Sequence, residues 1–389
     1  MTARPSPAAR RFAACLIVWH ERHGRHDLPW QHGRTAYRVW VSEIMLQQTQ
    51  VSTVIGYYER FMQRFPDVAT LAGAPLDEVL HLWSGLGYYS RARNLQRAAQ
   101  RLVAEHGGQL PEQPAELERL PGIGRSTAAA IVALALDRRA SILDGNVRRV
   151  LARYFGVEGA PDQRGTQAAL WQHAQACTPE REVAVYTQAI MDFGATLCTR
   201  SRPLCMHCPL SADCVAHRSG RVAELPTPRR RPERPTRRTV MLLAVRTDGS
   251  VLMHRRPARG VWPQLWTPPE FADIEAARSF CAVGVAQPAQ ALPLSALPLE
   301  ALPLVRHAFT HFDLEITPVR SAWSGGDEGA VCGPAAAVRE PDAAVEAPQS
   351  LWYNARQPAR IGIPAPIAAL LASLRSGSTL PQAPLPTDD

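Results

Sequence analysis

The sequence predicts a chain of two domains that differ in class, an all-helical domain followed by a smaller domain of mixed α and β structure. From about residue 11 to residue 215, amphipathic stretches alternate with short turns, and no convincing run of strands interrupts them. A stretch rich in proline and arginine follows at 224–238. From Thr239 onward the apolar residues recur at the shorter period of strands, and 389 residues suffice for more than one core.

The composition shifts give the domain boundaries. The predicted segments are a disordered N-terminus (1–10), the helical domain (11–223), a stiff and solvated linker (224–238), the second domain (239–375) and a disordered tail (376–389).

Within the second domain, turn signals and alternation predict individual elements. The expected elements are a hairpin formed by 240–245 and 251–253, a strand toward the end of 307–317, a closing helix at 367–374, and variable loops at 284–304 and 324–348.

The composition favours a polyanionic partner and a reducing compartment. The formal net charge is +8, and all 43 basic residues are arginine, so no lysine side chain is available to form a Schiff base. No signal peptide is evident, and no apolar run approaches the length of a membrane-spanning helix. We therefore expect a protein of the bacterial cytoplasm, associated with the nucleoid, with no membrane partner.

A short glycine-bearing motif, Leu120–Ala128, is predicted to join two helices. Gly122 and Gly124 permit a tight turn and a close backbone approach, and Ser126 or Thr127 is expected near the N-cap of the second helix. Amide groups at a helix N-terminus bind anions such as phosphate. We interpret the motif as a helix-hairpin-helix that grips a DNA backbone, and an ordinary Pro-Gly helical hairpin is the alternative.

Glu43 is a candidate general acid. It lies among apolar residues in Tyr37–Val51, and a carboxyl group in such surroundings loses hydration, which raises its pKa and keeps it protonated near neutral pH. The alternative is a glutamate on the polar face of a helix, and the periodicity does not exclude it.

Asp144 is the candidate partner of that acid. It precedes Gly145, Asn146 and a predicted helix, so it suits an N-cap, and the helix dipole favours its ionised form. One neutral and one charged carboxyl group form the usual pair for cleaving a glycosidic bond. A purely structural cap is the alternative reading.

Four cysteines cluster with the pattern C-x6-C-x2-C-x5-C, which indicates one metal centre with four thiolate ligands. Four thiolates suit either zinc or an iron–sulfur cluster. The ligands are Cys198, Cys205, Cys208 and Cys214.

Paired tyrosines stand beside arginines in Gly85–Leu95. Aromatic rings next to basic groups suit stacking or wedging into bases with phosphate anchoring. Core tyrosines beside a solvated basic face are the alternative.

Taken together, these motifs resemble those of MutY-type adenine DNA glycosylases, in the helix-hairpin-helix superfamily that includes endonuclease III. The resemblance covers roughly residues 11–375. It rests on Leu28-Pro-Trp30, Val41–Gln50, Gly85–Tyr89, Leu120–Thr127, Ile142–Val147 and the cysteine spacing. It implies excision of adenine mispaired with 8-oxoguanine or guanine in double-stranded DNA, a 4Fe–4S cluster rather than zinc, a Nudix-like C-terminal domain that reads the oxidised guanine, and a monomer.

The resemblance also implies roles for single residues. Glu43 would protonate the flipped adenine and help to activate water, Asp144 would stabilise the oxocarbenium-like sugar, and Asn146 would orient Asp144. The residues implied to contact the mispair or the backbone are Trp30 and Gln188 in the adenine pocket, Gln48 and Tyr88 as wedges, Gly122, Gly124, Arg125 and Ser126 in the hairpin, and Phe309, Thr310 and His311 at the oxidised guanine.

Two departures refine this expectation. Lyase relatives carry a lysine where this chain has Ser126, so we expect a monofunctional glycosylase without efficient strand cleavage. The second domain lacks the clustered glutamates that bind magnesium in Nudix pyrophosphatases, so we expect a reader and not a hydrolase. The rival hypotheses are a thymine or uracil glycosylase, a DNA-damage sensor without catalysis, and hydrolysis of oxidised nucleotides by the second domain.

Overall fold

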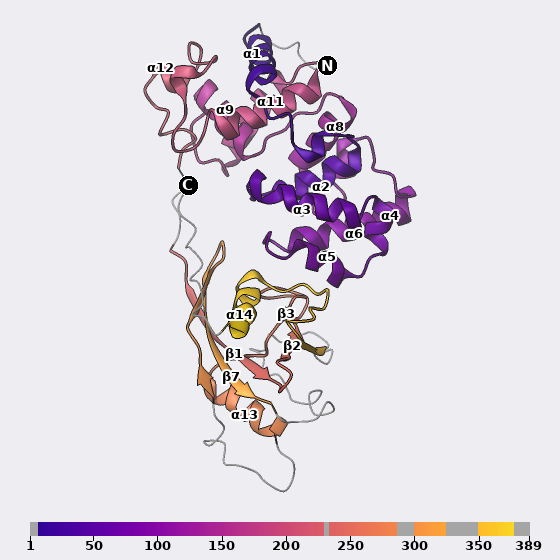
Figure 1. The fold of residues 1–389 in the computed structure, drawn as a ribbon. Coiled ribbons are helices and arrows are strands. Elements are labelled where there is room, and N and C mark those ends of the chain that lie inside the picture. The colour runs from indigo at the N-terminus through magenta and orange to yellow at the C-terminus, as the bar shows by residue number, and fades with distance from the viewer. Residues whose placement is uncertain (1–6, 229–232, 286–298, 324–348, 377–389) are drawn as a thin grey trace. The chain divides into compact units, whose positions relative to one another are not determined.

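The computed structural model describes residues 7–228, 233–285, 299–323 and 349–376 (Figure 1). Its contacts divide the chain into two compact units, which we call the helical unit and the sheet unit. The helical unit comprises Met1–Ala74 and Ser90–Arg231, and the sheet unit comprises Pro75–Tyr89 and Pro232–Asp388.

The described part of the helical unit contains helices and no strand, which confirms the helical class predicted from the periodicity. Its elements are α1 (Pro7–His23), the 3-10 helix η1 (Pro29–Gln31), α2 (Ala36–Leu46), α3 (Val51–Arg64), α4 (Val68–Gly73), α6 (Ser90–His106), α7 (Pro114–Leu117), α8 (Arg125–Leu136), α9 (Gly145–Phe155), α10 (Arg164–Cys177), α11 (Val183–Thr196), the 3-10 helix η2 (Cys205–His207) and α12 (Val215–Arg218).

Helix α8 is the centre of this unit. Every residue from Ala128 to Leu134 is buried, so the helix is covered on all sides, as its uniformly apolar sequence requires. Its alanines leave room for neighbours, and α2, α7 and α11 pack against it. The helices that carry Glu43 and Gln188 therefore share one central support.

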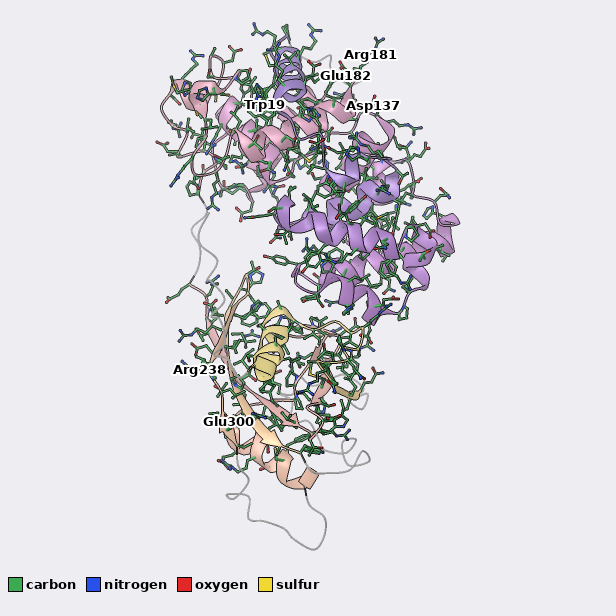
Figure 2. The ribbon with its side chains drawn as sticks, in the orientation of Figure 1. Trp19, Asp137, Arg181, Glu182, Arg238 and Glu300 are labelled. Carbon is green, nitrogen blue, oxygen red and sulfur yellow. The ribbon has the colours of Figure 1, made fainter. Side chains whose placement is uncertain are left out.

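The C-terminal end of α8 is tied to the start of α11. Asp137 caps α8 in a left-handed conformation, and its Oδ1 accepts a hydrogen bond of 2.8 Å from the backbone N–H of Ala184. Glu182, which precedes α11, is labelled near Asp137 in Figure 2. Trp19 of α1, also labelled there, packs edge-on against Phe193 of α11 with ring centroids 5.0 Å apart. Both contacts fix the position of α11, from which Gln188 extends.

The described part of the sheet unit combines one eight-stranded sheet with three helices. Its elements are α5 (Leu76–Trp83), β1 (Thr236–Val245), β2 (Val251–Arg255), β3 (Trp266–Thr267), β4 (Glu270–Phe271), α13 (Ile274–Val285), β5 (Glu300–Ala301), β6 (Val305–Ala308), β7 (Asp313–Ala322), β8 (Ser350–Tyr353) and α14 (Ala365–Ser376).

Strand β1 is the middle of the sheet. The order β3-β2-β1-β7-β5 places it between an antiparallel partner, β2, and a parallel partner, β7, with Thr236 opposite Asp313. Val240 and Leu242 pack in a cluster with Cys281 of α13. Met241 points to the other face and is buried too, so both faces of β1 are covered.

Several expected elements are confirmed. The hairpin is β1–β2, the strand toward the end of 307–317 is β7, and the closing helix is α14. The expected N-terminal disorder is wrong for residues 7–10, because α1 begins at Pro7. Strand β1 begins at Thr236, inside the expected linker.

The remaining expectations about loops and ends fall partly on residues that the structure does not describe. The ranges outside the described residues are 1–6, 229–232, 286–298, 324–348 and 377–389. In the described part of the chain, α13 continues to Val285 and β5 forms at Glu300–Ala301, so these parts of the expected loop 284–304 are regular structure, whereas 302–304 are not.

Candidate active site

Glu43 lies on α2, next to the fully buried Ile44 and close to the fully buried Trp40. Loss of hydration, and to a smaller extent the negative charge of Asp144, together raise the pKa of its carboxyl group from 4.5 to about 8. The structure therefore brings the two predicted carboxyl groups within electrostatic reach of each other. Near neutral pH, Glu43 holds a proton that it can donate.

Asp144 caps the N-terminus of α9. Its Oδ1 accepts a hydrogen bond of 2.8 Å from the N–H of Val147, and the side chain of Asn146 donates to its Oδ2 at 3.4 Å. Burial raises the pKa of Asp144, whereas the backbone hydrogen bonds and the charges of Arg149 and Arg148 lower it. The helix N-terminus lowers the pKa of Asp144, as expected, but the loss of water is the larger effect and the net shift is upward.

Arg149 is a site residue that sequence reasoning missed. Its Nη2 donates to the side-chain oxygen of Asn146 at 2.8 Å and to the carbonyl of Gly194 at 2.6 Å, and its Nε donates to the carbonyl of Cys198 at 2.8 Å. One guanidinium thus orients Asn146, α11 and the first cysteine together. The available signal was the spacing of three residues between Asn146 and Arg149, which places both on one helix face.

Gln188 is buried on α11 and points at a charged network. Its Nε2 donates to Oδ1 of Asp192 at 2.9 Å, and Asp192 itself has no exposed surface. Arg25 donates hydrogen bonds to the same carboxylate from its backbone N–H, at 2.8 Å, and from its guanidinium. Nε2 of His20 lies 3.4 Å from Oδ2 of Asp192. Because its amino end is occupied, Gln188 keeps its carbonyl oxygen for another donor. No local sequence pattern pointed to Asp192.

Trp30 and Gln48 lie in the helical unit but in different environments. Trp30 of η1 is 6% exposed and packs edge-on against Tyr58 at 5.4 Å. Gln48 is exposed and has φ of 58°, a left-handed conformation that costs energy for a residue other than glycine. Arg91 supports the turn, because its guanidinium donates to the carbonyls of Met45 and Gln47 just before it.

The hairpin between α7 and α8 contains a left-handed glycine. Gly122 has φ of 80°, and a Cβ there would lie 2.7 Å from the Cβ of Asn94, so only glycine fits. The N-cap of α8 is Gly124, which corrects the expectation of Ser126 or Thr127. The hydroxyl of Ser126 instead accepts a hydrogen bond of 3.0 Å from the N–H of Leu143, the residue before Asp144. The hairpin therefore also holds the loop that leads to Asp144.

Arg125, the first residue of α8, lies with its guanidinium 3.8 Å above the ring of Trp171 on α10. Stacking of this kind restrains a long side chain without neutralising its charge. Arg125 is exposed, so the charge remains available to a phosphate group.

The four clustered cysteines line one apolar cavity, whose other walls come from α9, α11 and the loop around η2. The Nη1 of Arg153 donates to the sulfur of Cys198, and the thiol of Cys214 donates to the backbone carbonyl of Arg153, both at 3.4 Å. Burial raises the pKa of Cys208 to about 12, and the neighbouring thiols add to this effect. Thiolates at this site therefore need a cation to stabilise them.

In the sheet unit, Thr310 and His311 form the exposed tip of the β6–β7 hairpin. The tip is closed by a hydrogen bond of 2.9 Å from the N–H of Phe309 to the carbonyl of Phe312, and the two phenyl rings stack 4.5 Å apart. Trp262 packs against Phe309 from the side. The polar pair is thus presented on an aromatic base.

Tyr88, also in the sheet unit, has φ of 47° and is 47% exposed, whereas Tyr89 is buried. The paired tyrosines therefore have different roles: the first faces outward from a strained turn, and the second belongs to the packing. Sequence reasoning selected the exposed one.

Comparison with known proteins agrees with this arrangement. Residues 41–176 match the HhH-GPD superfamily of base excision DNA repair proteins, and residues 240–373 match the NUDIX domain. The fold and the site thus define a two-part base excision DNA repair protein.

Individual relatives identify the family within this class of repair proteins. The adenine DNA glycosylase of Buchnera aphidicola subsp. Acyrthosiphon pisum is 32% identical over 367 residues, which cover 94% of this chain and 97% of the relative. The adenine DNA glycosylase of Rattus norvegicus is 46% identical over 227 residues, or 55% of this chain and 44% of the relative. The chain belongs to the adenine DNA glycosylase family, the MutY type that its motifs resemble.

A solved structure supports the helical class. A thermostable thymine-DNA glycosylase superposes with a TM-score of 0.50 at 28% sequence identity, and the match covers 55% of this chain and 98% of the other. None of the helices in the described ranges is long and apolar enough to span a membrane.

The raised pKa of Glu43 predicts a pH-dependent cost in stability. Between pH 4.5 and about 8 the unfolded chain loses this proton and the folded protein keeps it, so the free energy of unfolding falls as pH rises through this range. Glu43→Gln should therefore melt at a higher temperature than wild type at pH 8, and the difference should shrink toward pH 4.5. Thermal melts across pH, with the exposed Glu59→Gln as control, test this; equal shifts in both variants would contradict it.

The buried network around Asp192 predicts a large loss of stability on substitution. Asp192→Asn removes the charge that pairs with Arg25 and His20, so the free energy of unfolding should fall by about 3 kcal/mol. Asp27→Asn, at an exposed position, should change it by less than about 0.5 kcal/mol. Urea unfolding of both variants measures the difference, and a loss near zero for Asp192→Asn would exclude a stabilising role for the network.

Proposed function

We propose that this protein removes adenine paired with 8-oxoguanine or guanine in double-stranded DNA by hydrolysing the N-glycosidic bond. The observation that carries the proposal is the electrostatic coupling of two carboxyl groups, Glu43 on α2 and Asp144 at the N-cap of α9. Family membership supports adenine as the base.

The chemistry assigns opposite tasks to the two groups. Adenine leaves readily only when protonated, and Glu43 with a pKa of about 8 is a neutral acid at pH 7. The sugar left behind carries positive charge, which the carboxylate of Asp144 stabilises. Asn146 and Arg149 orient that carboxylate, because one donates to Asp144 and the other to Asn146.

The base must leave the helix before it can react. In the proposal, Trp30 and Gln188 line the pocket that receives it, while Gln48 and Tyr88 fill the gap. The strained backbones of Gln48 and Tyr88 support this role, since left-handed residues other than glycine gather at functional sites. The hairpin residues Gly122, Gly124, Arg125 and Ser126 hold the DNA backbone.

We further propose that the protein does not act as an efficient lyase. A lyase step starts from an amine that attacks the sugar, and this chain contains no lysine. At the position where lyase relatives carry that lysine, Ser126 is engaged with the backbone of Leu143. Hydrolysis by water is the remaining route.

The cysteine site fits a 4Fe–4S cluster. Four thiols surround one apolar cavity, and the buried guanidinium of Arg153 beside Cys198 suits an anionic sulfur cage. In the described part of the chain, no three His, Cys, Asp or Glu side chains are grouped as the ligands of a single metal ion would be. The ligands would be Cys198, Cys205, Cys208 and Cys214, and the cluster would supply structural cross-linking of the loop.

The sheet unit is proposed as the reader of the oxidised base, through Phe309, Thr310 and His311. Its match to the NUDIX domain suggests hydrolysis of nucleotides as another candidate. However, Glu270 in this unit is engaged by Arg256 and by the hydroxyl of Thr239, which leaves no cluster of free carboxylates for magnesium among the described residues. We also propose that the protein acts as a monomer and is associated with the bacterial nucleoid.

Base release from defined duplexes tests the function. In single turnover, wild type should release adenine from A:8-oxoG and A:G duplexes and nick the strand only after alkali treatment. The rate should fall as pH rises past about 8, because Glu43 then loses its proton. Glu43→Gln should bind the A:8-oxoG duplex but release no adenine. Preferential release of thymine from a T:G duplex would show that the protein is a thymine glycosylase. If wild type bound the A:8-oxoG duplex but released no base, the protein would be a damage sensor.

The cluster assignment predicts a coloured protein. Wild type should carry iron and sulfide and absorb in the visible range, and Cys208→Ala should lose both colour and stability of the loop. Cys177→Ala, which removes a buried thiol outside the cavity, is the control and should keep the colour. Metal analysis that found one zinc and no iron in wild type would overturn the assignment.

A further inference from the structure

The turn that presents Tyr88 is an unusually constrained piece of backbone. Gly85 and Gly87 have φ of 105° and 71°, and Tyr88 follows them at 47°. The N–H of Leu86 donates to the carbonyl of Trp83 at 3.0 Å, and the indole N–H of Trp83 donates to the carbonyl of Gly87 at 3.2 Å. These local bonds shape the turn, but they do not anchor it to the rest of the sheet unit.

The anchor comes from a segment far along the chain. The hydroxyl of Tyr89 donates to the carbonyl of Ile363 at 3.1 Å and accepts from the N–H of Gly85 at 3.4 Å. The N–H of Ile363 in turn donates to the hydroxyl of Ser84 at 3.4 Å. Ile363 therefore holds both ends of the turn that contains Tyr88.

Helix α5, which leads into the turn, is fastened to the same part of the sheet unit. The indole N–H of Trp266 donates to Oδ1 of Asp77 at 3.1 Å, and its backbone N–H donates to the carbonyl of Gly362 at 2.9 Å. The ring of His81 lies 3.3 Å from the carbonyl of Ile361. Trp266 therefore connects α5 and the 361–363 segment directly.

Gly362 is placed where no side chain fits. A Cβ on this residue would lie 2.5 Å from the Cβ of Leu80 and 2.8 Å from Cδ2 of Leu265. Because its φ is not in the left-handed region, the requirement for glycine here comes from close approach and not from backbone conformation. Leu80 is fully buried on α5, so a methyl group at position 362 has to push the helix and the segment apart.

We propose that Ile361–Ile363 is a positioning element for Tyr88, so that the C-terminal sequence sets the conformation of the residue that fills the gap in the DNA. The proposal rests on the proposed function, in which Tyr88 and the Thr310–His311 tip both contact the mispair. Both belong to one compact unit. The wedge and the reader of the oxidised base therefore lie in the same unit, although Tyr88 and Thr310 are 222 positions apart in the sequence.

Hydrogen exchange on the free protein tests the anchor without reference to activity. In Gly362→Ala the amides of Gly85 and Leu86 should exchange about tenfold faster than in wild type, because the turn loses its support. Gly165→Ala, a helical glycine whose added methyl meets nothing within 4 Å, is the matched control and should leave both amides unchanged. Unchanged exchange in a folded Gly362→Ala would overturn the proposal.

If Gly362→Ala does not fold, Tyr89→Phe gives the same test by a smaller change. It keeps the ring and removes the hydroxyl that joins Ile363 to Gly85. The amide of Gly85 should again exchange faster, by about tenfold. Protection equal to that of wild type would show that the turn holds its shape without Ile363.

A double-mutant cycle then asks whether the anchor acts through Tyr88. Gly362→Ala should slow adenine release from an A:8-oxoG duplex about tenfold, and it should cause no further loss in a Tyr88→Ala background. In a His311→Ala background its effect should persist in full. Equal effects in all three backgrounds would show that Gly362 acts elsewhere. A wild type that releases no adenine would refute the proposed function, while the exchange result would still stand or fall by itself.

Discussion

The helical unit depends on a carboxyl pair kept from water. Burial raises the pKa of both Glu43 and Asp144, and the charge of Asp144 raises that of Glu43 as well, so ionising both groups costs stability. The fold relieves Asp144 through the N-terminus of α9 and through Arg149, and it gives Glu43 no such relief. This asymmetry supports the proposed roles of Glu43 as the acid and Asp144 as the anion.

The surrounding structure supports both members of this pair. Helix α8 supports α2 from one side, and Ser126 at its start ties down the residue before Asp144. Arg149 donates hydrogen bonds to Asn146, to Gly194 and to Cys198, the first of the four cysteines. The loop that carries the cysteines is therefore connected to the residues beside Asp144. A cluster bound at that loop would therefore stiffen the site without taking part in the chemistry.

In the sheet unit, two exposed segments also depend on distant contacts. Tyr88 extends from a left-handed backbone position, and Thr310 and His311 stand on the stacked rings of Phe309 and Phe312. Each is stabilised by neighbours of high sequence separation, Ile363 in one case and Trp262 in the other. The exposed side chains that are proposed to contact DNA are thus held in place by other residues, Ile363 and Trp262, for which no contact with DNA is proposed.

The sequence by itself determined the two classes of structure, the cap at Asp144, the left-handed glycine of the hairpin and the cysteine site, because each depends on local periodicity, local sterics or short spacing. Only the tertiary structure decided that Pro75–Tyr89 packs with the C-terminal sequence, that burial outweighs the cap in the pKa of Asp144, and that Arg149 and Asp192 belong to the site. These features depend on contacts between segments far apart in the chain, and on how much water those contacts exclude. Neither quantity has a local signature in a single sequence.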